Sequence, residues 1–217
     1  MIGLLLDSLS NNTGDRAICE VMIDFLKAQQ CEFDLVSPLG YDHRRYDRLI
    51  IGGGHLIRSP GDLYYDNFRV PGEHILNTVG VSSSDSLDYL KSYLYVSVRS
   101  QADYTRIGNI VPGAAVVPCV SLFLEPDAST SLVSEGAIGF HFDPFTWQTI
   151  GDISLFAQFK DYQLVLVPVM HYTDERSVFE RVACTSSVPV AVLPPLPPRK
   201  LLFEIGRLKA FVTTALH

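Results

Sequence analysis

Short apolar runs alternate with amphipathic and turn-rich stretches along the whole chain. Runs of bulky, β-branched residues such as Leu49-Ile50-Ile51 favour strands of a parallel sheet that is buried on both faces. Segment 16–29 instead carries apolar residues near helical spacing. Strands are predicted at 2–6, 31–36, 49–51, 75–81, 94–99, 115–117, 137–142, 164–169, 188–193 and 210–213, and helices at 16–29, 86–92, 101–107, 150–159, 174–184 and 199–207.

This order of elements predicts an α/β fold of the doubly wound kind. Segment 125–135 is rich in Ser, Thr, Pro and Asp and poor in apolar residues, which indicates a linker. The strand–helix pattern restarts after it, so we expect two domains, 1–130 and 131–217. The second would end on a strand with no covering helix, and we therefore expect the chain to be a fragment or a naturally shortened form.

Composition narrows the class of protein. The 217 residues are 47% hydrophobic and 19% charged, which predicts a sizeable core and argues against disorder. A net charge of -7 argues against nucleic-acid and anionic-membrane partners. No apolar run approaches the roughly 20 residues that span a bilayer, and the N-terminus lacks a basic signal segment. The four cysteines show no metal-like spacing, so we expect reduced thiols, a cytoplasmic protein and no metal.

Three glycines follow the apolar run directly: Gly52, Gly53 and Gly54. Glycine allows a sharp turn and leaves no Cβ, so a ligand can approach the main chain. In open parallel sheets, ligands lie beyond the carboxyl ends of the strands. The triplet therefore predicts the floor of a binding site, with a tight turn that holds no ligand as the alternative.

Two further segments complete a pattern. The loop Asn11-Asn12-Thr13-Gly14-Asp15 lies between a predicted strand and helix, and Tyr95-Val96-Ser97-Val98-Arg99 delivers an arginine to a strand end. With the glycine triplet between them, and Phe211-Val212-Thr213-Thr214-Ala215-Leu216-His217 at the end, the chain resembles the polysaccharide pyruvyl transferase family. That family commonly has an Asn-x-Gly-Asp loop, a strand ending in a glycine triplet, a Ser-x-Arg strand end and an Arg-Leu-His motif.

The resemblance implies a pair of Rossmann-like domains, as in B-type glycosyltransferases. It implies transfer of a pyruvyl group from phosphoenolpyruvate to saccharide hydroxyls as a ketal, as in exopolysaccharide biosynthesis, with no further cofactor. The sequence departs from the family pattern where Ser100 replaces an aspartate, Cys119 follows Pro118 in place of aspartate, and Ala215 replaces the motif arginine.

The chemistry of phosphoenolpyruvate as the donor predicts which residues would bind it. Phosphate and carboxylate groups need main-chain amides, a helix N-terminus and fixed arginines. Arg99 is the anion-binding candidate, with a surface salt bridge as its alternative. The expected substrate-binding residues are Asn12, Gly14, Asp15, Gly52, Gly53, Gly54 and Arg99. For Asp15 the alternative is a helix N-cap or an organiser of the loop.

Histidine suits the proton transfers of ketal formation. His171 follows a strongly apolar strand, and His217 matches the family's motif histidine, so both are expected to be catalytic. His55 follows the glycine triplet and either lines the site or is a solvated loop residue. The other histidines, His43, His74 and His141, have no supporting sequence context.

Other classes stay open on sequence alone. A sugar transferase with a nucleotide-sugar donor would have the same fold. A non-catalytic relative that binds a saccharide or a partner protein would fit Ala215, and the aromatic residues at 64–68 could stack on sugar rings. A NAD-dependent dehydrogenase is disfavoured, because the glycine triplet lacks the GxGxxG spacing.

Overall fold

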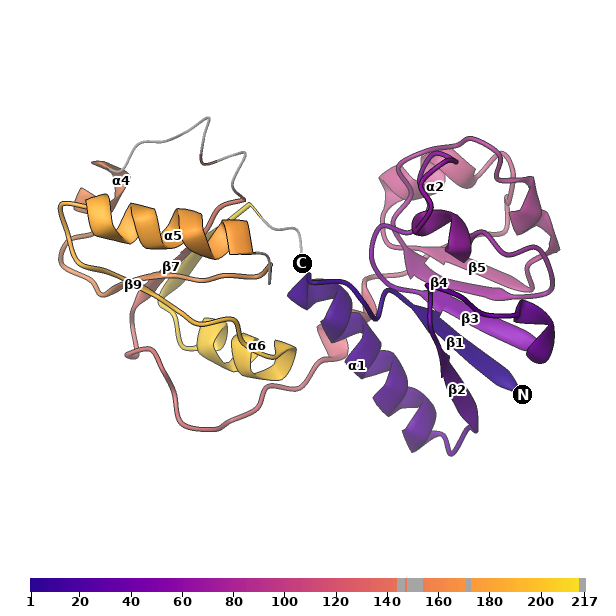
Figure 1. Ribbon diagram of the computed structural model, residues 1–217, viewed down its shortest axis with the longest axis horizontal. Coiled ribbons are helices and arrows are strands. Elements are labelled where there is room, and N and C mark those ends of the chain that lie inside the picture. Colours follow the sequence, from indigo (N-terminus) through magenta and orange to yellow (C-terminus); the bar gives the residue numbers. More distant parts are fainter. Residues whose placement is uncertain (144–146, 148–153, 171–172, 215–217) are drawn as a thin grey trace. The chain divides into compact units, whose positions relative to one another are not determined.

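The computed structural model describes residues 1–143, 147, 154–170 and 173–214. The chain is a mixed α/β protein with two parallel sheets (Figure 1). It divides into two compact units. Unit 1 comprises Met1–Ser10 and Asp15–Leu124, and unit 2 comprises Asn11–Gly14 and Glu125–His217.

Unit 1 is built on a six-stranded sheet in the order β2-β1-β3-β4-β5-β6, and every pairing in it is parallel. The strands are β1 (Ile2–Leu6), β2 (Phe33–Val36), β3 (Arg48–Gly52), β4 (Ile75–Val79), β5 (Tyr95–Val98) and β6 (Ala115–Val116). The chain runs from β1 outwards to β2 and then returns to β3 on the other side of β1. The strand order therefore reverses between β1 and β3, which is where open α/β sheets bind ligands.

Alternate residues of the central strands face opposite layers of unit 1. Leu4 and Leu6 pack with Ile18, Met22 and Leu26 of helix α1 (Thr13–Ala28). These helix residues recur at intervals of four, so they form one apolar stripe. Leu5, Leu49 and Ile51 pack in a separate core with Phe68, Leu90 and Ile107.

The second core of unit 1 is covered mainly by short elements. They are η2 (Tyr65–Phe68), η3 (Asp88–Ser92) and α2 (Gln101–Ile107). Two more 3₁₀ helices lie in unit 1: η1 (His43–Arg45), and η4 (Val120–Phe123), whose Val120 packs against the first core. The helix predicted at 86–92 is thus a 3₁₀ helix that begins at Asp88. Its sequence carries one fully buried residue, Leu90, which is too little apolar surface to hold a longer α-helix on the sheet.

His74, one of the histidines to which the sequence assigns no role, has a structural role in the core of unit 1. His74 lies just before β4, at the edge of the sheet opposite the carboxyl ends, and is 6% exposed. Its Nδ1 atom accepts a hydrogen bond from the Leu49 amide at 3.2 Å. Burial, followed by the charge of His43, lowers the pKa of His74 and keeps the ring neutral.

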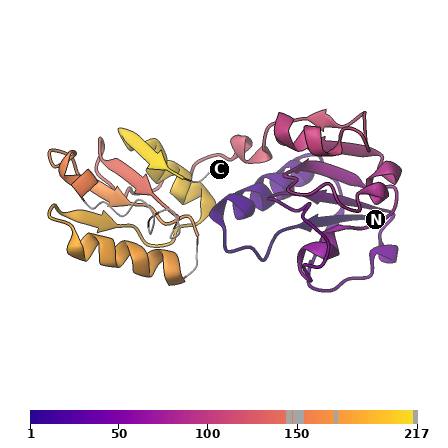
Figure 2. The same ribbon diagram turned by 90° about the horizontal axis from the view of Figure 1, so that it is seen from above.

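Unit 2 is built on a four-stranded parallel sheet in the order β10-β7-β8-β9. The strands are β7 (Ile138–His141), β8 (Leu164–Leu166), β9 (Val190–Val192) and β10 (Ala210–Thr213), and the described helices are α4 (Ser154–Ala157), α5 (Thr173–Thr185) and α6 (Pro198–Gly206). Phe156 of α4 and Phe179 of α5 share one core with Phe140, while Leu201 of α6 packs in the other with Val165. Figure 2 shows α5 along one side of these strands.

The segment predicted as a linker is fastened to unit 2 by one buried carboxylate. Glu204 of α6 is 1% exposed and accepts hydrogen bonds from the Leu132 amide at 2.9 Å and the Ser131 hydroxyl at 2.8 Å. The Lys200 ammonium lies 2.9 Å from the same carboxylate. Burial alone would raise the pKa of Glu204, but the hydrogen bonds from Lys200, Leu132 and Ser131 outweigh it, and the pKa lies below its ordinary value.

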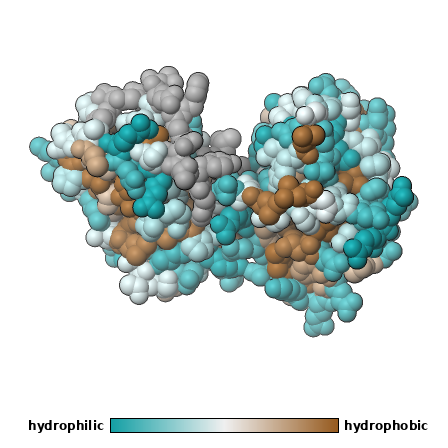
Figure 3. Space-filling view, viewed as in Figure 1, coloured by the Kyte–Doolittle hydropathy of each residue, from teal (hydrophilic) through white to brown (hydrophobic). Residues whose placement is uncertain are grey.

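Some large apolar side chains remain on the surface, and Figure 3 shows such brown areas among the teal ones. The most exposed are Leu63, Leu122 and Phe123, at 90%, 74% and 76%. Exposed apolar residues are normal on folded proteins, so we assign these no part in the site.

Candidate functional site

Polar and charged residues gather at the carboxyl edge of the unit 1 sheet. Asp7 follows β1, the glycine triplet ends β3, Gly80 follows β4 and Arg99 follows β5. Asp15 lies in the first turn of α1, which begins beyond the same edge. The parallel register therefore brings the predicted glycines, Asp15 and Arg99 to one edge of one sheet.

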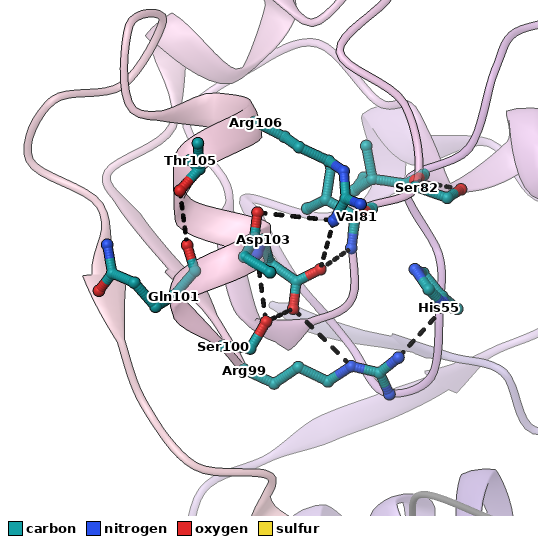
Figure 4. Close-up of polar contacts among 11 residues, drawn as sticks. His55, Val81, Ser82, Arg99, Ser100, Gln101, Asp103, Thr105 and Arg106 are labelled. Atoms are coloured by element: carbon teal, nitrogen blue, oxygen red, sulfur yellow. Dashed lines mark hydrogen bonds and ion pairs between the residues drawn. The ribbon is translucent and has the colours of Figure 1, made fainter.

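Arg99 is held firmly at this edge. Its side chain is 13% exposed, and its Nε atom lies 3.9 Å from Asp103 Oδ2. Its Nη2 atom lies 3.2 Å from Nδ1 of His55, as Figure 4 shows. The guanidinium lies directly over Gly80, because a Cβ built there would be 2.6 Å from Nη2. Only glycine at position 80 leaves room for the arginine in this orientation.

His55 is neutral in this arrangement. Partial burial, followed by the positive charge of Arg99, lowers the pKa of His55. A guanidinium only donates hydrogen bonds, so His55 Nδ1 accepts from Arg99 and the ring proton lies on Nε2. The ring also has a hydrogen bond with the Val81 backbone, so Arg99 is the member of the pair whose charge suits an anionic ligand.

Asp103 anchors the start of α2 behind Arg99. The carboxylate is 4% exposed and accepts hydrogen bonds from the Val81 amide at 2.8 Å and the Ser100 hydroxyl at 2.6 Å (Figure 4). The Ser100 hydroxyl in turn accepts from the Asp103 amide at 3.1 Å, which is a side-chain cap on the start of the helix. Ser100, a departure from the family pattern, is thus the N-cap of α2, and its Ser-x-x-Asp spacing is a signal that sequence reasoning could have used.

The glycine triplet has a packing role in addition to its predicted one. Gly53 and Gly54 have positive φ, at 91° and 54°, which disfavours residues with a side chain. A Cβ on Gly53 would lie 3.1 Å from Ile18, and a Cβ on Gly54 would lie 2.6 Å from Oδ1 of Asp15. The space beside these glycines is thus filled by the first turns of α1, so the glycines allow the helix to pack closely on the loop.

Two carboxylates share this edge. Asp7 is 3% exposed and accepts a hydrogen bond from the Tyr64 hydroxyl at 2.5 Å, and Asp15 accepts one from the Ser10 hydroxyl at 2.7 Å. Burial raises the pKa of both groups, more than these hydrogen bonds and the nearby charges lower it; those charges are Arg99 and Arg58 for Asp15, and Arg58 for Asp7. Each carboxyl therefore holds its proton to a higher pH than an ordinary aspartate does.

Arg58 adds a second cation to the group. Its Nε atom donates to the His55 carbonyl at 2.9 Å, and its guanidinium carbon lies 3.5 Å from the centre of the Tyr65 ring. Sequence reasoning did not single out Asp7, Arg58 or Asp103, because each lies in a turn or short helix without a periodic pattern, and it considered Tyr64 only for stacking on sugar rings. Their position along the chain could have indicated them, because each closely follows a strand or lies at the start of the next element.

Two of the other predicted site residues are grouped with unit 2, and the two predicted catalytic histidines are not described. Asn12 and Gly14 belong by their contacts to unit 2, where the Gly14 amide donates to Asn12 Oδ1 at 2.7 Å. His171, His217 and Ala215 lie outside the described residues. Within the described residues, no group of three His, Cys, Asp or Glu side chains could hold a metal ion, and no helix is both long and apolar enough to cross a bilayer.

The fold and this edge define the chain as a parallel α/β protein with cations, carboxylates and a glycine turn at the carboxyl ends of one sheet. The chain belongs to the polysaccharide pyruvyl transferase family, which residues 12–217 match. The resemblance of its ordered segments to that family is thereby confirmed.

Comparison with solved structures supports the fold. Four solved chains match. One is an uncharacterized protein from Klebsiella pneumoniae, which is 14% identical, with 89% of this chain and 92% of that chain covered and a TM-score of 0.50. At this identity the likeness concerns the fold alone. No curated protein matches the chain.

Proposed function

We propose that this protein transfers the pyruvyl group of phosphoenolpyruvate to saccharide hydroxyls and forms a ketal. The observation that carries the proposal is the Arg99–His55 pair, fixed over Gly80 at the carboxyl edge of a sheet in a chain of the pyruvyl transferase family. Phosphoenolpyruvate carries a phosphate and a carboxylate, and Arg99 and Arg58 are the cations that would bind them.

The reaction requires proton transfers that this edge can support. The enol carbon must gain a proton to become the methyl group of the ketal, the attacking hydroxyls must lose theirs, and phosphate must leave. Asp15 is the candidate proton donor, because its pKa is raised by burial. His171 and His217 remain proposed catalysts from sequence, and Asn12, Gly14 and the glycine triplet remain proposed contributors to substrate binding.

We further propose that both units are Rossmann-like domains of the B-type glycosyltransferase class, with boundaries near residue 130. The reversal of strand order in each sheet supports this. The four free cysteines support a reducing compartment, and hence the predicted cytoplasmic location.

The test is phosphate release from phosphoenolpyruvate in the presence of galactosides and mannosides, with the ketal methyl group followed by NMR. Arg99→Gln should lower kcat/KM by about 10²-fold or more, since it removes a charged hydrogen-bond donor from a largely buried place. Arg48→Gln is the matched control, because Arg48 begins β3 at the opposite edge and is exposed. Absence of phosphate release with every saccharide would overturn the proposal. Thermal stabilisation by nucleoside diphosphates instead would indicate a nucleotide-sugar transferase.

A further inference from the structure

Unit 2 contains a buried pair of titratable side chains that the proposed function does not use. His141 is the last residue of β7 and Glu175 lies in the first turn of α5; they are 2% and 1% exposed. His141 Nε2 lies 2.8 Å from Glu175 Oε1. The sequence places these residues 34 positions apart and offers no motif that connects them.

The hydrogen bonds around this pair favour one position for its proton. The second oxygen of Glu175 accepts from the amides of Val169 at 3.0 Å and Met170 at 2.7 Å. We assign the proton of the His141–Glu175 contact to His141 Nε2, so that both oxygens of Glu175 accept. In the neutral ring Nδ1 is then an acceptor, and it lies 3.1 Å from the Thr213 hydroxyl oxygen. Thr213 therefore donates to His141.

This chain of hydrogen bonds leads from the core to the surface. Glu175 and His141 are buried, whereas Thr213, the last residue of β10, is exposed. The strand order of the unit 2 sheet reverses between β7 and β10, since β8 and β9 follow on the other side of β7. His141 and Thr213 thus end the two strands that flank the reversal, where a parallel sheet offers a ligand site.

A purely structural role would explain only part of this arrangement. The bonds from Val169 and Met170 to Glu175, together with that of His141, already hold the start of α5 on the sheet. They need no hydroxyl at the outer end of the histidine. The exposed Thr213 hydroxyl, polarised by a histidine and a carboxylate behind it, is the arrangement that activates a hydroxyl for proton transfer.

We propose that Glu175, His141 and Thr213 form a proton relay that binds and deprotonates a saccharide hydroxyl. The sugar proton passes to Thr213 Oγ1 while the Thr213 proton passes to His141 Nδ1, and the resulting imidazolium is stabilised by Glu175. The electron pair left on the sugar oxygen forms the new C–O bond. The electrophile is the central carbon of the enolpyruvyl group, after the terminal carbon has gained a proton. This choice of electrophile rests on the proposed function. Phosphate leaves with the electrons of its bond to that carbon. A second hydroxyl of the same saccharide then bonds to the carbon and closes the ketal, and its proton passes to the released phosphate.

Thr213 is the catalytic residue here, and His141 and Glu175 are positioning residues that act through it. Thr213→Val removes the hydroxyl and keeps the shape, and it should lower kcat by about 10²-fold with little change in KM. Thr213→Ser restores a hydroxyl and should recover most of the activity. Thr214→Val is the matched control, because the Thr214 hydroxyl bonds Asp143 instead. Equal activity of Thr213→Val and wild type would overturn the relay.

Nitrogen-15 NMR of the full chain provides a second readout that does not need turnover. The wild type should show His141 protonated on Nε2, and addition of a methyl galactoside or mannoside should shift its Nδ1 signal. Thr213→Val should abolish that shift, and Thr213→Ser should retain it. A proton on Nδ1, or no shift with any saccharide, would overturn the proposal. A saccharide-dependent shift without phosphate release would defeat the proposed reaction and leave the hydroxyl-binding relay standing.

Discussion

Gly80→Ala tests whether the position of Arg99 controls donor binding. The new Cβ would lie 2.6 Å from Nη2 and 2.8 Å from the guanidinium carbon of Arg99. Ordinary contact between such atoms is about 3.5–4.0 Å, so the guanidinium must move by about 1 Å. That displacement breaks the 3.2 Å contact with His55. The displaced guanidinium would also lose one charged hydrogen bond to phosphoenolpyruvate. Such a bond is worth about 1.5–3 kcal/mol, which corresponds to about a 10- to 100-fold rise in the Kd for phosphoenolpyruvate.

Calorimetric titration with phosphoenolpyruvate measures this Kd, and thermal unfolding checks the fold. Gly80 has no positive φ, so alanine there should leave Tm unchanged or slightly raised through the lower entropy of the unfolded chain. Gly113→Ala is the matched control, since a Cβ there meets nothing within 4 Å. A stable Gly80→Ala protein with wild-type affinity would refute the assignment of Arg99 to the donor site.

Two further predictions concern stability. Gly54→Ala should destabilise the protein by about 1–2 kcal/mol in urea unfolding, because residue 54 has a φ of 54° and its Cβ would lie 2.6 Å from Asp15. Gly40→Ala is the control and should not destabilise the protein, because a Cβ at position 40 meets nothing within 4 Å. Glu204→Gln should cost about 1–3 kcal/mol at pH 7, because it weakens the bonds that hold the segment around Leu132. The folded-state pKa of Glu204 is lowered, so this stabilisation is present above its ordinary value of 4.5 and is lost as the pH falls through the lower folded-state value. The difference between wild type and Glu204→Gln should therefore shrink in acid, while Glu135→Gln, whose side chain is 87% exposed, should differ little from wild type at any pH. A constant difference across the pH range would show that the charge of Glu204 is not what stabilises unit 2.

The elements of this fold follow largely from local patterns. The β-branched run at Leu49-Ile50-Ile51 becomes a buried strand of a parallel sheet, and the apolar spacing in 16–29 becomes helix α1, whose core-facing side the structure shows to be Ile18, Met22 and Leu26. Such periodicities are properties of neighbouring residues, so the sequence alone predicts them. The family also follows from sequence, because its motifs are short segments in a set order.

The partners of the functional side chains were decided by the tertiary structure. Arg99 was identifiable from its place at a strand end, but its contact with His55 spans 44 residues and its fit over Gly80 depends on the pairing of β4 with β5. In the same way, His141 carried no signal in sequence and gained its meaning from Glu175 and Thr213. These contacts arise when parallel strands from distant parts of the chain align their carboxyl ends, and a local pattern contains no information about that register.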